Sequence, residues 1–368
     1  MGVDLFSQFN IGRLELRNRF VRSATWDGTA DVAGEVTEKS VAIYRKLAAG
    51  EIGLIVTGYA FVSLQGQATF GQYGIYSDEL IPGLKRLTEV VHQKGGKIAV
   101  QIVHAGISAV PGISSAPAVS VLPHIEREHH EMTGEEIEQI IDDFAAAARR
   151  AVEAGFDAVQ LHGAHGYLMS QFLSPSKNLR RDKWGGSLEN RARFNFEVIR
   201  RIRKEVGRDY PLLIKFGIRD ESDSGLKLEE GIQVASWMVR EGVDAIEVSA
   251  GVATARSAIP ILRPEEPERA VFRERASALK KKVDAPVALV GGIRSLSLGE
   301  DIVSSGDADL ISMCRPFIRE PDILVKWKNK SSVRSTCVSC NQCMRLIREQ
   351  GVFACGRQIN IEKEGSGA

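Results

Sequence analysis

Short apolar runs alternate with amphipathic stretches along most of this 368-residue chain. Most runs are continuously apolar, which is typical of parallel strands buried on both faces. We interpret eight of them as strands: RFVRS (19–23), GLIVTG (53–58), KIAVQIVH (97–104), FDAVQLHG (156–163), LLIKFG (212–217), DAIEVSAG (244–251), PVALVGG (286–292) and ADLISMC (308–314). Eight strands that alternate with helices predict an α/β chain with a single (β/α)8, or TIM, barrel.

The stretches between the runs carry signals for helix ends. In residues 132–155, Thr133 and Glu136 have the spacing of a capping box. Residues 227–242 end at Gly242, a typical C-cap residue.

A doubly wound sheet is the alternative fold. No G-x-G-x-x-G motif follows the first strand, however, which counts against a Rossmann dinucleotide fold.

Composition and charge narrow the classes of partner and the compartment. The chain has 48 basic and 47 acidic residues and a formal net charge of +1, so nothing favours nucleic acid or an anionic membrane as a partner. No stretch approaches the roughly 20 apolar residues that span a bilayer, and the N-terminus does not resemble a signal peptide. We therefore expect a cytoplasmic protein, in which thiols stay reduced.

The last predicted strand ends near residue 314, and the sequence changes character soon after it. We expect an FMN-binding barrel over residues 1–330, an iron–sulfur-binding C-terminal segment over 331–360, and a flexible tail over 361–368. The two cofactor assignments in this division depend on the strand ends and the cysteines discussed below.

Polar residues gather where the predicted strands end, which is where barrels of this kind carry their chemistry. A phosphate site in such a barrel is expected to offer backbone amides and a cation. Strand seven ends with Gly291 and Gly292, which can supply the amides, and Arg315 after strand eight can supply the cation. Gln101 and Lys215 suit the polar edge of a flat heterocycle. Together they favour a phosphorylated cofactor such as FMN. A sugar phosphate substrate, or simple capping of strands, fits the same residues.

One long segment, residues 162–194, closely resembles the signature of the old yellow enzyme family of flavin oxidoreductases. The resemblance extends over nearly the whole chain, to RNRFVRSATWDG (17–28), QIVHAG (101–106), LIKFG (213–217), VGGI (290–293) and CRPFIREPD (314–322). It implies a (β/α)8 barrel that binds FMN non-covalently. It also implies an NADH:flavin oxidoreductase of the ene-reductase type, with NAD(P)H as an electron donor.

The resemblance also implies residue roles. His162 and His165 would donate hydrogen bonds to a substrate carbonyl oxygen, and Tyr167 would protonate the α-carbon. Paired histidines beside a glycine-rich turn are otherwise read as hydrogen-bonded core groups or metal ligands. The residues that the resemblance places around FMN are Ser23, Ala24, Thr25, Trp26, Gly58, Gln101, His162, Lys215, Gly291, Gly292, Cys314 and Arg315.

Trp26 departs from the pattern of that family, and His162 separates the chain from the amine dehydrogenases within it. Trp26 stands near the reactive edge of the flavin, where relatives carry Thr, Cys or His-Thr, and this changes cavity volume and redox tuning. His162 stands where the amine dehydrogenases of the family carry tyrosine. Alkene reduction therefore fits the sequence better than amine oxidation.

Four of the five cysteines lie within CVSCNQCMRLIREQGVFAC, residues 337–355. Cys337, Cys340, Cys343 and Cys355 have the spacing C-x2-C-x2-C-x11-C, which suits three corners of a 4Fe–4S cluster and a remote fourth ligand better than two separated zinc-binding pairs. The segment also resembles the iron–sulfur run of 2,4-dienoyl-CoA reductases and trimethylamine dehydrogenase, with one residue fewer in a single gap. We predict a 4Fe–4S cluster, with zinc or no metal as alternatives.

These observations predict an FMN-dependent ene-reductase. It would reduce the activated C=C bond of an enone, enoate or enoyl thioester, and the cluster would relay electrons to the flavin. The larger relatives continue into a nucleotide-binding domain, so we expect electrons from a separate donor protein or directly from NAD(P)H. The alternatives are a non-catalytic flavin and iron–sulfur electron-transfer subunit, and an amine dehydrogenase. We also expect a homo-oligomer.

Overall fold

The computed structural model describes residues 3–110, 115–252 and 268–359. The flexible tail expected at 361–368 lies outside these residues. Within them, no helix is both long and apolar enough to cross a membrane.

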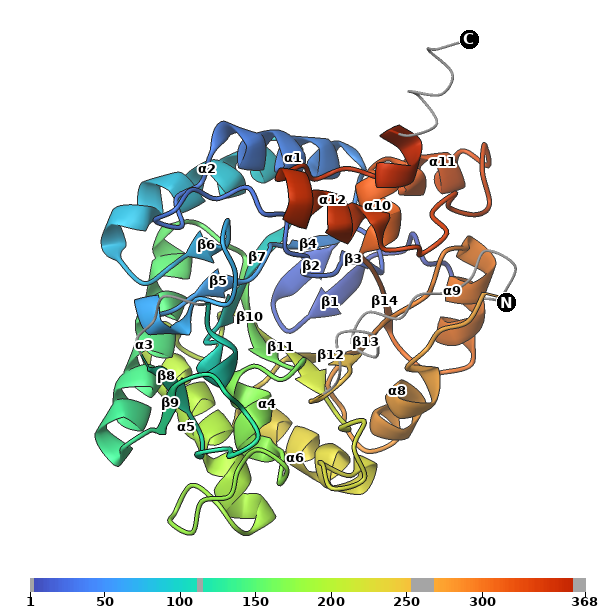
Figure 1. Ribbon diagram of the computed structural model, residues 1–368. Helices are drawn as coiled ribbons and strands as arrows, with labels where there is room; N and C mark the ends of the chain where they lie inside the picture. Colours follow the sequence, from blue (N-terminus) through green and yellow to red (C-terminus); the bar gives the residue numbers. More distant parts are fainter. Residues whose placement is uncertain (1–2, 111–114, 253–267, 360–368) are drawn as a thin grey trace.

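Eight parallel strands close into a barrel, as predicted (Figure 1). Each neighbour pair in the order of the chain is parallel, and β10 pairs with β7 to complete the ring. All eight fall inside the apolar runs identified from the sequence. They are β3 (Phe20–Arg22), β4 (Leu54–Val56), β7 (Ile98–Val103), β10 (Ala158–Gly163), β11 (Leu212–Gly217), β12 (Ala245–Ser249), β13 (Val287–Val290) and β14 (Leu310–Met313).

Amphipathic helices surround the barrel and bury their apolar faces against it (Figure 1). The predicted capping box is present: the Glu136 amide donates to Thr133 Oγ1 at 3.2 Å, and the Thr133 amide donates to Glu136 Oε2 at 2.7 Å. Gly242 ends its helix with φ +119°, a conformation that glycine adopts readily. The helices are α1 (Glu38–Ala49), α2 (Ile81–His92), α3 (Gly134–Glu153), α4 (Leu168–Leu173), α5 (Leu188–Val206), α6 (Leu228–Glu241), α8 (Arg273–Lys280), α9 (Leu296–Ser304), α10 (Arg315–Arg319), α11 (Ile323–Lys328) and α12 (Gln342–Gln350).

An antiparallel hairpin, β1 (Phe9–Ile11) and β2 (Leu14–Leu16), closes the N-terminal end of the barrel. Its apolar side chains form one cluster with the inward residues at the start of the barrel strands, including Leu54, Ala158 and Leu310. With that end plugged by apolar groups, the C-terminal ends of the strands are the open face. Short pairs β5 (Ala60–Phe61) with β6 (Tyr73–Gly74), and β8 (Ala116–Ala118) with β9 (His129–Glu131), lie in the loops at that face.

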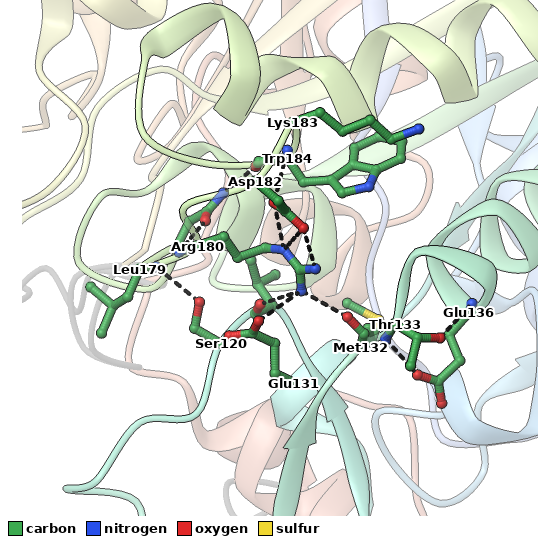
Figure 2. A network of polar contacts seen from close by, with 12 residues as sticks. Ser120, Glu131, Met132, Thr133, Glu136, Leu179, Arg180, Asp182, Lys183 and Trp184 are labelled. Carbon is green, nitrogen blue, oxygen red and sulfur yellow. Dashed lines mark hydrogen bonds and ion pairs between the residues drawn. The ribbon is translucent and has the colours of Figure 1, made fainter.

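A buried arginine fastens the loop between α4 and α5 to the β8–β9 pair (Figure 2). Arg180 Nη1 donates to the carbonyl oxygens of Val119 and Met132, at 3.1 and 2.8 Å. Its Nε and Nη2 donate to the carboxylate of Asp182, which also accepts from the Trp184 amide at 3.0 Å. These contacts give Arg180 a structural role, because they hold the loop after Tyr167 against the β8–β9 pair.

The cysteine-rich segment folds against the last barrel helices rather than standing apart. Arg315, at the start of α10, donates to Ser339 O at 2.9 Å and to Asn341 Oδ1 at 2.6 Å. Ser339 and Asn341, on either side of Cys340, both have positive φ values, of 56° and 60°. Non-glycine residues rarely adopt this left-handed backbone conformation, so two such residues in three positions make the chain turn sharply around Cys340. α12 follows directly.

Candidate active site

A cavity of about 910 Å³ opens at the C-terminal ends of the barrel strands. It brings together every predicted catalytic and cofactor-binding residue except Gly58 and Gly292. The Gly58 amide donates to the Tyr44 hydroxyl at 2.9 Å, and a Cβ at Gly58 would lie 3.0 Å from Thr25 O. Close packing of neighbouring loops thus accounts for glycine at position 58.

A buried ion pair forms the floor of the cavity. Lys215 Nζ lies 3.3 Å from Glu247 Oε1 and donates to Ser23 Oγ at 2.6 Å. Ser23 and Ser312 each donate to Glu247 Oε1 at 2.7 Å, and Gln160 donates to Oε2 at 3.0 Å. Burial favours the neutral acid, yet the charge of Lys215 and these hydrogen bonds hold the pKa of Glu247 below its ordinary value. The floor is therefore a fully connected, charged network.

Gln101 extends this network and leaves one acceptor unused. Its Nε2 donates to Gln160 Oε1 at 2.7 Å. Its Oε1 is buried and has no hydrogen-bond partner within the part of the chain that the structure describes. A buried acceptor without a partner is costly, so this oxygen is available to accept an N–H from a bound ring.

Glu247 and Gln160 were not singled out from the sequence. A signal for both was present, because each is a polar residue inside an otherwise apolar strand run. An inward position in a buried strand requires such a residue to have polar partners. What the sequence did not show was that the two side chains meet across the barrel.

Two glycines follow β13, and Gly291 lines the cavity. Gly291 and Gly292 have φ values of +111° and +87°, and a Cβ at Gly291 would lie 3.1 Å from the ring of Phe272. Both positions therefore need glycine. Beside them Cys314 Sγ accepts a hydrogen bond from Thr25 Oγ1 at 2.9 Å, so this thiol is held within the barrel.

Two histidines and a tyrosine converge at the C-terminal end of β10, His162 within the strand and the other two just after it. The ring centroid of His162 lies 5.0 Å from that of His165 and 4.8 Å from that of Tyr167, both nearly perpendicular. His165 has a φ of 61°, and its Nε2 lies 2.7 Å from Ser249 Oγ. Nδ1 of His162 is buried and has no partner among the described residues.

Burial sets the protonation states of this group. It lowers the pKa of His162 well below the ordinary value, and it lowers the pKa of His165 to about 3, with the charge of Lys215 acting in the same direction. Both imidazoles are therefore neutral near pH 7. Burial also raises the pKa of Tyr167 well above the ordinary value, so its hydroxyl keeps its proton.

Tyr59 joins the group and was missed from the sequence. Its ring lies 5.6 Å from Tyr167 and 5.9 Å from His162, and its hydroxyl accepts a hydrogen bond from Tyr167 Oη at 3.4 Å. It directly follows Gly58, at the end of the second predicted strand. Its position at a strand end was the only sequence signal that Tyr59 could belong to the site. An aromatic residue at a strand end is equally typical of a side chain that only packs against its neighbours.

Trp26 lines the cavity without filling it. Its Nε1 is buried and has no partner among the residues described. The loop that carries it continues to Gly28, where an added Cβ would lie 2.6 Å from Ile347 Cγ2. The cysteine-rich segment is thus packed onto the loop after β3, and its helix α12 supplies part of the cavity wall.

The five cysteines are all free thiols. Cys343 is buried, which raises its pKa to about 12, and Arg319 Nη1 donates to Cys355 Sγ at 3.1 Å. In the described ranges, no three His, Cys, Asp or Glu side chains lie close enough together to hold one metal ion. A single-ion zinc site is not preformed there.

Comparison with known proteins supports the resemblance drawn from the sequence. The chain is 38% identical over 346 residues to an NADH oxidase of Thermoanaerobacter brockii, covering 92% of this chain and 53% of that protein. It is 36% identical over 323 residues to an NADPH dehydrogenase of Bacillus subtilis, covering 87% of this chain and 93% of that protein. A solved 2-naphthoyl-CoA reductase complex superposes with a TM-score of 0.87 and 29% identity, over 95% of this chain and 56% of that one.

The chain therefore spans little more than half of two of these relatives and nearly all of the third. The sequence model of one family matches residues 4–333, which is most of the chain. The barrel fold, the match to the family model and the sequence identities to the two curated relatives all point to the same family. The chain belongs to the NADH:flavin oxidoreductase / NADH oxidase family, the family of the old yellow enzymes.

Proposed function

We propose that the chain binds FMN and reduces the activated C=C bond of an α,β-unsaturated carbonyl compound. The observation that carries this proposal is the convergence of two neutral imidazoles and one protonated phenol on a single cavity. The neutral donors can bind a carbonyl oxygen, and the phenol can give a proton to a carbon near it.

The residues of the cavity fit FMN. Gln101 Oε1 is a buried acceptor without a partner among the described residues and could accept a ring N–H, and Lys215 would supply a positive charge on the floor of the same cavity. Gly291 and Gly292 both have positive φ values, and their backbone amides would serve the phosphate group. When bound, FMN supplies the hydride for the β-carbon of the substrate.

The side chains of this chain then have distinct tasks. His162 and His165 donate hydrogen bonds to the carbonyl oxygen and stabilise the negative charge that develops on it. Ser249 holds the imidazole of His165 at 2.7 Å, so less reorganisation is needed when the substrate binds. Tyr167 donates its proton to the α-carbon, and its raised pKa keeps that proton in place until a basic carbon forms.

We further propose that residues 331–360 carry a 4Fe–4S cluster on Cys337, Cys340, Cys343 and Cys355. In a cubane each thiolate binds a different iron, so the four sulfurs need not converge on one point as zinc ligands do. The positive φ values on both sides of Cys340 support a chain wrapped around a large group. When bound, the cluster transfers single electrons. A donor protein would supply electrons one at a time through the cluster, whereas NAD(P)H would give a hydride directly to the flavin.

The test uses FMN-loaded protein purified without oxygen. We expect visible bands of both flavin and cluster, with iron and acid-labile sulfide present in equal amounts. Reduced protein should be reoxidised by 2-cyclohexenone at a rate that depends on its concentration. A flavin spectrum without iron would remove the cluster from the proposal. Reduced flavin that no enone or enoyl thioester reoxidises would favour the electron-transfer alternative, and reduction by amines would favour amine oxidation.

A further inference from the structure

Helix α12 connects the cysteine-rich segment to the cavity. Met344, Ile347, Arg348 and Gly351 all line the cavity, although they lie beyond the barrel in sequence. Ile347 is 3% exposed and packs against the loop at Gly28, so the helix is seated firmly. Side chains on this face of α12 are therefore held at the cavity wall.

Among the residues that the structure describes, the charged side chains that line the cavity are all positive. They belong to Lys215, Arg315 and Arg348, with no aspartate or glutamate among the described lining residues. Lys215 is paired with Glu247, and Arg315 donates to the Ser339 carbonyl and to a side chain of the same segment. Two of the three cations are thus already engaged within the protein.

Arg348 differs from the other two cations. Its side chain is exposed at the rim of the cavity, and its guanidinium makes no hydrogen bond or ion pair with another side chain that the structure describes. Burial raises the pKa of the hydroxyls of Tyr59 and Tyr167, and the positive charge of Arg348 opposes that rise at both. The field of Arg348 therefore acts where the substrate carbonyl is proposed to bind.

A second arginine on the same helix shows the ordinary alternative. Arg345 is 73% exposed on its side chain and pairs with Glu349, four residues later, at 3.5 Å. It does not line the cavity. An exposed pair of this kind contributes little. Arg348 has no such partner, although Glu349 is its neighbour in the chain.

We propose that Arg348 selects substrates that carry a carboxylate in addition to the activated double bond. The planar guanidinium can bind a carboxylate through two parallel hydrogen bonds, and a cleft lined with one sign of charge concentrates ligands of the opposite sign. This inference rests on the proposed function and names the substrate class of the same site. A phosphate group of a nicotinamide nucleotide has similar chemistry, and the experiment separates the two sources.

The binding arm uses the FMN-loaded full chain and two product-like probes that cannot be reduced, 4-oxopentanoate and its methyl ester. Calorimetry should show tighter binding of the acid. Arg348→Gln should weaken acid binding by about tenfold or more and reduce the acid-to-ester ratio accordingly. Arg345→Gln should leave that ratio unchanged. Equal binding of acid and ester, or an unchanged ratio in Arg348→Gln, would overturn the inference.

The kinetic arm uses (E)-4-oxopent-2-enoate and its methyl ester, together with NADH and NADPH. The inference expects Arg348→Gln to raise KM for the acid more than for the ester, with little change in KM for either nucleotide. A rise confined to the nucleotides would assign Arg348 to phosphate binding and overturn it. If neither compound is reduced while the acid still binds more tightly, the proposed function fails and the anion preference stands.

Discussion

The hydroxyl groups of Tyr167 and Tyr59 lie 3.4 Å apart, and Tyr167 donates the hydrogen bond. Both rings pack against His162, with centroid separations of 4.8 and 5.9 Å. Burial raises the pKa of both phenols, so each keeps its proton near pH 7. Only Tyr167 comes from the same segment as the two histidines, the end of β10 and the loop after it. The pair therefore consists of a proposed acid and a neighbour that holds its hydroxyl in place.

The first prediction separates these two roles. Tyr167→Phe removes the proton donor and should slow reoxidation of reduced protein by 2-cyclohexenone by about 10²-fold or more, while reduction of the flavin stays close to normal. Tyr59→Phe removes only the acceptor of the 3.4 Å bond, so its effect should be clearly smaller. Stopped-flow absorbance measures both half-reactions. Equal losses in the two variants would assign the proton to the pair rather than to Tyr167.

The second prediction concerns the floor of the cavity. Glu247→Gln leaves Lys215 as a buried cation without its counter-charge, so unfolding in urea should require about 3 kcal/mol less free energy. The matched control is Glu349→Gln, which breaks an exposed pair and should cost less than about 1 kcal/mol. Loss of the negative charge should also raise the reduction potential of bound FMN. A stability change no larger than that of the control would contradict the buried pairing.

The barrel could be predicted because each buried strand is a nearly continuous apolar run, and eight such runs leave few alternative folds. The β1–β2 hairpin could not, because two three-residue strands around Gly12 and Arg13 are too short to show a period. Strand ends also differed by a residue or two: β3 covers Phe20–Arg22 of the predicted 19–23.

The candidate site was predictable wherever one strand end carries the chemistry, as at His162, His165 and Tyr167. Residues that matter through contact between distant segments were missed. Glu247 becomes significant only when three other strands and the residue after β3 bring Lys215, Gln160, Ser312 and Ser23 to it. Arg348 lies on a helix whose place on the cavity wall depends on packing against Gly28, a tertiary contact that no local pattern encodes.

The third prediction concerns the hydrogen bonds by which Arg180 holds the loop between α4 and α5 to the β8–β9 pair (Figure 2). Arg180→Ala leaves the buried carbonyls of Val119 and Met132 without a donor, so stability should fall by about 3 kcal/mol. Amide hydrogen exchange should accelerate at both residues and in the loop that contains Trp184. Arg181→Ala changes an exposed neighbour and should alter stability by no more than about 0.5 kcal/mol. Similar exchange rates in the two variants would argue that Arg180 does not hold this loop in place.

The fourth prediction concerns pH. Burial lowers the pKa of His104 from 6.5 to about 3, so between these values the unfolded chain binds a proton that the folded chain does not. Stability contributed by the neutral histidine is present above pH 6.5 and is lost as pH falls toward 3. His104→Gln removes this loss. Between pH 6.5 and pH 5, its unfolding free energy should therefore fall by about 1.5 kcal/mol less than that of the wild type. Parallel curves in chemical denaturation would exclude the shift.

The fifth prediction distinguishes the proposed cluster ligands from a neighbouring thiol. Burial raises the pKa of both Cys337 and Cys343, and the nearby thiol of Cys314 adds to the rise at each, so its proximity makes Cys314 a rival ligand. Its sulfur, however, already accepts a hydrogen bond from Thr25 within the barrel. Cys343→Ser should therefore lose most iron and sulfide from protein purified without oxygen. Cys314→Ser should retain about four irons per chain.

Flavin content provides the internal check on this comparison, because a variant that has merely unfolded loses FMN as well as iron. Cys343→Ser protein that keeps its flavin and loses its iron would place the defect at the cluster alone. If Cys314→Ser is the variant that loses iron, the C-x2-C-x2-C-x11-C assignment is wrong, and the cluster would share a ligand with the wall of the flavin cavity. That result would put the metal and the substrate site in direct contact through β14.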